Sequence, residues 1–140
     1  MKGTMADYFT NFSLTLPLNP EQRDYAMDLV RQALAHRHEN TPLPDTFPAE
    51  LKSVVEDWCF ETGEDGDELW LHSQYGSQDE ACVFIQHLLR KFRFANSVAF
   101  EWSHDCTKPK TDAYGGGAAY ITRNRIKTMH TSEWLRKQAG

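Results

Sequence analysis

The sequence contains no apolar run that approaches the roughly 20 residues needed to cross a bilayer. Its amino terminus also lacks a basic segment followed by an apolar stretch, which is the pattern of a secretory signal. Both absences lead us to expect a soluble protein with no membrane partner. The cytoplasm is the location that this reading favours.

Cysteine is scarce, and the few that occur are far apart at Cys59, Cys82 and Cys106. An odd number without Cys-x-x-Cys spacing does not fit a disulfide framework, so we expect reduced thiols. The short spacings of a zinc site are absent too, and we expect neither a bound metal nor a cofactor. One alternative stays open, a metal held by residues that neighbouring strands bring together: Cys59, His72, His104 and Cys106.

The sequence of 140 residues is rich in large hydrophobic residues. Hydrophobic residues make up 40% of the chain, and there are eight Phe, five Tyr and four Trp. This composition is typical of a folded protein of one domain rather than of a disordered chain. We therefore expect residues 1–140 to form a single domain.

Charge is distributed unevenly along the chain, although the net charge is only −5. Residues 1–89 carry sixteen acids and five bases, a net −11, whereas residues 90–140 carry ten bases and four acids, a net +6. Residues 56–68 hold seven acids and no base. This segment either recognises a basic partner or protects an exposed hairpin edge. A group of bases forms either a local patch or an ordinary solvated surface: Arg123, Arg125, Lys127, Arg136 and Lys137.

Regular hydrophobic patterns predict the first elements. Apolar residues at alternate positions over residues 8–18 predict a strand with one buried face. Asn19 and Gln22 have the spacing of a capping box, and the apolar stripe that follows predicts a helix from residue 20 to about residue 38. Two prolines in residues 39–47 predict a surface connection.

A hairpin and a second helix are predicted next. The dipeptide Asp65-Gly66 favours a tight turn between strands at residues 58–64 and 67–75, and pairing about it places Thr62 opposite Leu69. Behind this hairpin, Ser77 to Glu80 form a second capping box for a helix that continues to Phe92.

The remaining pattern predicts a strand at residues 98–102 and a hairpin of residues 118–122 with 126–130. Thr131 or Ser132 is then expected to cap a terminal helical turn. The complete order resembles the split strand-helix-strand plan of ferredoxin-like domains. We therefore predict an α+β fold, a ferredoxin-like βαββαβ sandwich with an additional carboxy-terminal hairpin and short helix. Because this fold serves many unrelated tasks, it indicates no particular function.

The densest group of reactive side chains lies in the predicted connection at residues 103–114. Connections of this length often bind a partner. The predicted binding residues are Trp102, His104, Asp105, Lys108, Lys110, Asp112, Tyr114 and Gly116.

The leading hypothesis is a non-enzymatic interaction domain with a regulatory role, whose sheet face or long loop binds another protein or a second copy. One alternative is a cysteine-dependent enzyme with Cys106 as nucleophile and His104 as base. The simpler interpretation of Cys106 is an inert thiol in a structured loop. Gly115-Gly116-Gly117 then supplies oxyanion or anion-binding amides, unless it is simply the bulged entrance to a strand.

Single-stranded nucleic-acid binding is a further alternative, with Trp70 and Trp102 as a stacking platform on the open sheet face. The acidic pI of about 5.6 and the lack of a basic-glycine-aromatic motif count against it. Any tryptophan that the fold leaves exposed becomes a binding candidate in its own right.

Overall fold

The first strand predicted from hydrophobic alternation is present as β1 (Tyr8–Leu16) and ends where Pro17 can no longer donate a ladder hydrogen bond. The computed structural model describes residues 7–140, with the exception of the Asp112 side chain. Within them the fold is mixed α+β, as predicted, with four α-helices and a six-stranded antiparallel sheet. No helix in this part of the chain is long and apolar enough to span a bilayer.

The elements after β1 follow the predicted alternation of helices and strands. They are α1 (Pro20–Glu39), α2 (Ala49–Lys52), η1 (Val55–Asp57), β2 (Glu61–Asp65), β3 (Glu68–Ser73), α3 (Gln78–Lys91), β4 (Val98–Cys106), η2 (Thr111–Ala113), β5 (Gly115–Ile121), β6 (Ile126–His130) and α4 (Thr131–Ala139).

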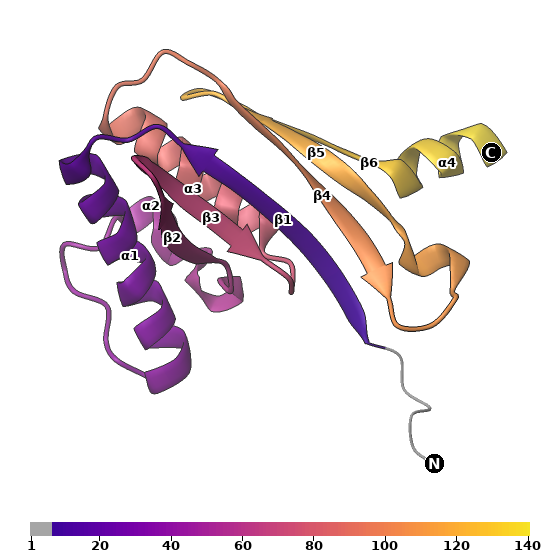
Figure 1. Ribbon diagram of the computed structural model, residues 1–140, viewed down its shortest axis with the longest axis horizontal. Helices are drawn as coiled ribbons and strands as arrows, with labels where there is room; N and C mark the ends of the chain where they lie inside the picture. The colour runs from indigo at the N-terminus through magenta and orange to yellow at the C-terminus, as the bar shows by residue number, and fades with distance from the viewer. Residues whose placement is uncertain (1–6) are drawn as a thin grey trace.

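The strands lie in the order β2-β3-β1-β4-β5-β6, and every neighbouring pair is antiparallel. Helix α1 lies beside β2, whereas α3 contacts α2 and also reaches β5 and β6, where Gln86 donates to the carbonyl of Thr122. Strands β5 and β6 and helix α4 extend the sheet beyond β4 (Figure 1). The order keeps the strands of the acidic half of the chain together and the strands of the basic half together. The acids of β2 and its turn and the bases around β6 therefore lie at opposite edges of the sheet, while β4 between them carries Glu101 and Asp105.

The core lies between one face of the sheet and the helices. Its centre is an aromatic cluster in which Trp58 stacks on Phe60, with ring centroids 4.5 Å apart, and meets Phe84 of α3 edge-on at 5.3 Å. All three side chains are fully buried. Burial of such large apolar surfaces is the main stabilising contribution to a domain of this size.

Two helix starts were predicted with capping boxes, and one prediction is right. At α1 the Asn19 side chain accepts from the Gln22 backbone at 2.9 Å, and the Gln22 side chain accepts from the Asn19 backbone at 3.0 Å. At α3 the prediction is wrong, because the Ser77 hydroxyl donates to the carbonyl of Asp57 and accepts from the amide of Cys59 instead. Ser77 thus ties the start of α3 to the segment before β2.

The β2-β3 hairpin is present, but its register differs from the prediction. Asp65 pairs with Glu68, so the turn is made by Gly66 and Asp67, one residue later than expected. Thr62 consequently lies opposite Leu71 and not Leu69. A turn displaced by one residue moves each partner by two positions, and two positions along a strand return to the same face. The predicted buried face is therefore retained.

Candidate functional site

The connection predicted at residues 103–114 is shorter than expected. Strand β4 continues to Cys106 because Tyr8–Asn11 of β1 pair with it on one side and Gly115–Gly117 of β5 pair with it on the other. Only residues 107–114 connect β4 to β5, and η2 occupies part of them. The first residues of the predicted loop, 103–106, therefore belong to a strand, and their side chains alternate between the two faces of the sheet.

His104 and Cys106 lie on the same face of β4, but they are not joined to each other. His104 Nδ1 lies 2.8 Å from the Thr10 hydroxyl, and the Cys106 sulfur accepts from the amide of Lys108 at 3.5 Å. No hydrogen bond joins His104 to Cys106, both of which belong to the described residues. The structure therefore supplies no nucleophile-base pair, and the cysteine-enzyme hypothesis stays a prediction.

The other predicted loop residues stabilise the connection itself. Tyr114 is exposed, and its hydroxyl donates to the carbonyl of Cys106 at 2.9 Å. The Lys110 ammonium lies 5.8 Å from the ring centre of Tyr8. Asp105 is exposed and accepts from Asn11 at 3.4 Å, and Lys108 is half-buried. The predicted Asp112 side chain lies outside the described part of the chain.

Trp102 and the three glycines form a closely packed part of the sheet. Trp102 is only 4% exposed, and a Cβ atom at Gly117 would lie 2.4 Å from its ring. Gly116 is buried and donates its backbone N–H to the Thr131 hydroxyl at 3.0 Å. This amide is therefore already bonded. The three glycines are the first residues of β5 and pair with β4 without a bulge, so the strand begins earlier than residue 118, where it was predicted to begin.

Two sets of residues that were expected to meet lie on opposite faces of the sheet. The ring of Trp70 points to the open face and that of Trp102 to the helix face, so they do not form one stacking platform. His72 likewise faces away from His104. Among the described residues, no cluster of three or more His, Cys, Asp or Glu side chains is arranged to hold a metal ion.

The open face of the sheet, which the sequence predicted only in outline, carries a more distinctive surface. Cross-strand pairs share a face, so the partners of Trp70 and His72 define which side chains point away from the helices. The acids on this face are Glu61, Asp65, Glu68, Glu101 and Asp105, and among the described strands its base is Lys127. The surface is therefore acidic.

A hollow of about 880 Å³ lies on the open face over β1, β3 and β4. Its aromatic wall is formed by Trp70, which is 37% exposed, His72, and Tyr75, which is 71% exposed. Glu61 and Glu101 border it on two sides. We define the open-face hollow by these five residues.

Trp70 is held in one orientation by its neighbours. Its indole N–H donates to the Ser13 hydroxyl at 2.7 Å, and its ring stacks on His72 with centroids 3.8 Å apart. Across the strand pair Gly63 leaves the space that the ring occupies, since a Cβ there would lie 2.9 Å from Trp70 Cε3. A partly exposed and preorganised aromatic ring loses little conformational entropy on binding.

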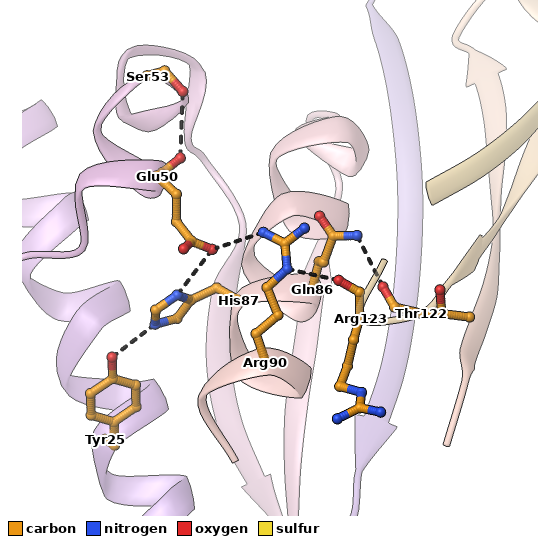
Figure 2. A network of polar contacts seen from close by, with 8 residues as sticks. All are labelled: Tyr25, Glu50, Ser53, Gln86, His87, Arg90, Thr122 and Arg123. Carbon is orange, nitrogen blue, oxygen red and sulfur yellow. Dashed lines mark hydrogen bonds and ion pairs between the residues drawn. The ribbon is translucent and has the colours of Figure 1, made fainter. Parts of the chain in front are cut away.

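A second polar cluster, which the sequence did not predict, joins the helices (Figure 2). His87 of α3 lies 2.8 Å from the Tyr25 hydroxyl through Nε2 and 3.3 Å from the Glu50 carboxylate through Nδ1. Arg90 contacts the same carboxylate at 3.7 Å and donates to the carbonyl of Arg123 at 2.7 Å. The helical periodicity alone did not indicate it, because His87 is a polar residue within a buried stripe.

The electrostatics of this cluster fit a structural role. Burial lowers the pKa of His87, against the opposing effect of Glu50, so the imidazole is held neutral. Burial and the charge of Glu50 both raise the pKa of Tyr25, so the phenol is held protonated and is not activated as a nucleophile. The cluster connects α1, α2 and α3 by hydrogen bonds.

Comparison with known proteins finds no family model, no curated protein and no solved structure that matches this chain.

Proposed function

We propose that this protein is a non-enzymatic interaction domain that binds a polypeptide with basic and apolar residues in the open-face hollow. The observation that carries the proposal is the combination of exposed, preorganised aromatic rings with bordering carboxylates on the face of the sheet opposite α1 and α3. Exposed aromatic anchors surrounded by polar residues are typical of protein interfaces.

The charge of the face supports a polypeptide partner over a nucleic acid. Phosphate backbones require Lys and Arg on the binding surface, whereas Glu61 and Glu101 border this hollow. Arginine and lysine side chains of a partner pair with such carboxylates, and an arginine also stacks on an indole ring. Trp70 between two acids thus favours a basic segment with an apolar or aromatic residue beside it.

We also propose that β1, α1, β2, β3, α3 and β4 form a ferredoxin-like unit in a single domain. The strand order β2-β3-β1-β4 and the contact between α1 and α3 through Tyr25 and His87 support this reading. β5, β6 and α4 are then the additional hairpin and helix. A cytoplasmic location is supported by three free cysteines.

Selection from a library of short random peptides tests the proposed binding. We expect enrichment of peptides that combine Arg or Lys with an aromatic or aliphatic residue, with dissociation constants of about 1–100 μM. Trp70→Ala and Glu101→Lys are each expected to weaken the selected peptides at least about tenfold, because they remove an anchor and reverse a paired charge.

The matched control is Asp24→Lys, which reverses an exposed acid on α1, on the other side of the sheet. It is expected to leave peptide binding unchanged. Enriched peptides of acidic character, or binding that Trp70→Ala and Glu101→Lys leave intact, would contradict the proposal.

A further inference from the structure

The sheet ends in two edge strands, β2 and β6. Among the described residues, β2 pairs only with β3 and β6 only with β5, so each presents one row of backbone groups that no described strand pairs. Both strands have five residues. Each edge therefore has the length and the backbone groups needed to accept a strand from another molecule.

The two edges carry opposite charges. The acidic edge consists of β2 and its turn, with Glu61, Glu64, Asp65 and Asp67, of which Glu64 also pairs with Arg23 at 3.4 Å. The basic edge consists of β6, the turn before it and α4. Its cations are Arg123, Arg125, Lys127, Arg136 and Lys137.

Charged edges prevent association between like edges, but they favour association between unlike ones. Two acidic edges repel each other, and two basic edges do the same. An acidic edge beside the basic edge of another copy places opposite charges together. The charges of the two edges thus select one pairing out of three.

Apolar surface beside both edges supports the same pairing. Helix α4 projects from the basic edge beyond the sheet (Figure 1), and it leaves Trp134 58% and Leu135 61% exposed. Beside the acidic edge, a groove of about 780 Å³ lies between α1, the connection after it and β2. The apolar residues that line this groove include Met27, Val30, Leu34, Pro42 and Pro44.

We propose that the protein self-associates head to tail, with β6 of one copy paired to β2 of the next and α4 seated in the groove beside β2. The two contact surfaces are different and lie at opposite ends of one sheet. Such a heterologous contact leaves a free edge at each end, so copies add into open chains unless the rotation closes a ring. This self-association shares Glu61 with the open-face hollow, but its other contact residues lie outside the hollow, and it does not depend on the proposed peptide binding.

Sedimentation velocity on complementary charge-reversal variants tests the proposal. The full chain is expected to increase in average mass past the dimer as its concentration rises to about 100 μM, and to dissociate at high salt. Arg125→Glu with Lys127→Glu reverses two charges of the basic edge, and Asp65→Lys with Asp67→Lys reverses two charges of the acidic edge. Each double variant alone is expected to associate about a hundredfold more weakly.

A mixture of the two double variants provides the decisive control. Each supplies the edge that the other lacks, so the mixture is expected to recover association, which also shows that both variants are folded. Trp134→Ser removes an exposed apolar contact, and at least about tenfold weaker association is expected. A wild-type chain that stays monomeric at about 100 μM, or a mixture that does not associate, would overturn the proposal. Unchanged association of Trp134→Ser would overturn the seating of α4.

Discussion

At the residue scale, glycines determine how closely the strands and rings of the far end of the sheet pack. A Cβ at Gly117 would lie 2.4 Å from the Met129 carbonyl oxygen and 2.4 Å from the Trp102 ring. Neither neighbour is the flexible end of a side chain, so a methyl group at this position requires the backbone or the buried ring to shift. The sequence pattern predicted that Gly117 precedes a strand. That residue 117 must lack a Cβ atom follows only from its contacts in the folded sheet.

Gly117→Ala is therefore expected to lower the free energy of unfolding by about 3 kcal/mol, the upper part of the range for overpacked cores. Denaturant titration followed by circular dichroism measures this change. A loss below about 0.5 kcal/mol would mean that β5, β6 and Trp102 are not packed as described.

The buried His87 predicts how stability depends on pH. Burial lowers its pKa in the folded state below the ordinary value of 6.5, so the unfolded chain takes up the proton first as the pH falls. The free energy of unfolding is thus expected to decrease as the pH is lowered from 7 through about 6.5 and below. Chemical denaturation at a series of pH values checks this.

His87→Gln is the control for that experiment, because it keeps a polar side chain but cannot titrate. We expect a smaller decrease of stability over the same pH range than in the wild type. If the two proteins lose stability equally, His87 does not carry the effect.

The three thiols are expected to differ in reactivity. Cys82 is buried, and burial with the nearby charges of Asp79 and Glu80 raises its pKa to about 12. Cys59 and Cys106 are partly exposed. A chromogenic disulfide reagent should therefore titrate two thiols quickly in the folded protein and the third only after unfolding. Cys82→Ala should leave the rapid count at two, and three rapid thiols in the wild type would contradict the burial.

At the element scale, most of the fold was predictable because local patterns determine it. Alternation located β1, and the Asn19 capping box located the start of α1. The errors occur where a distant contact decides the outcome. Strand β4 extends to Cys106 because β1 and β5 pair with it, and Ser77 does not cap α3 because its hydroxyl is bound to Asp57 and Cys59.

Helix α4 contrasts with the other long helices, since it has no buried residue. Truncation after Thr131, which keeps the hydroxyl that bonds Gly116, should change the free energy of unfolding by less than about 1 kcal/mol. It should also weaken self-association, because Trp134 and the last bases are lost. Thermal and denaturant unfolding of the truncated chain measure the first effect. Loss of folding would show that α4 stabilises the domain itself.

At the scale of the whole molecule, the strand order converts a linear charge pattern into a spatial one. The sequence showed acids in one half and bases in the other, but not whether folding would mix them. Because β2 and β6 are the two edge strands, the acids around β2 and the bases around β6 stay apart, although β4 adds Glu101 and Asp105 in the middle of the sheet. The open face also could not be predicted from the sequence, because the strand register determines that Trp70 and Trp102 point to opposite faces of the sheet.

The sequence predicted a binding site in the connection at residues 103–114, whereas the structure favours the open face of the sheet. Reactive side chains in residues 103–114 were an adequate reason to expect binding there, but their polar groups largely bond to one another and to β1. The exposed rings and acids of the open face come from separate strands. No local sequence pattern brings Trp70, Tyr75 and Glu101 together.

Nuclear magnetic resonance titration of the isotope-labelled protein with a selected basic peptide shows whether the open-face hollow is the binding surface. We expect the resonances of the Trp70 indole N–H and of the amides of Ser13, His72, Tyr75 and Glu101 to shift together and to saturate. We expect the amide resonances of residues 107–111 to stay unchanged. Shifts confined to that connection, with the Trp70 indole unchanged, would contradict the assignment of the open face as the binding surface.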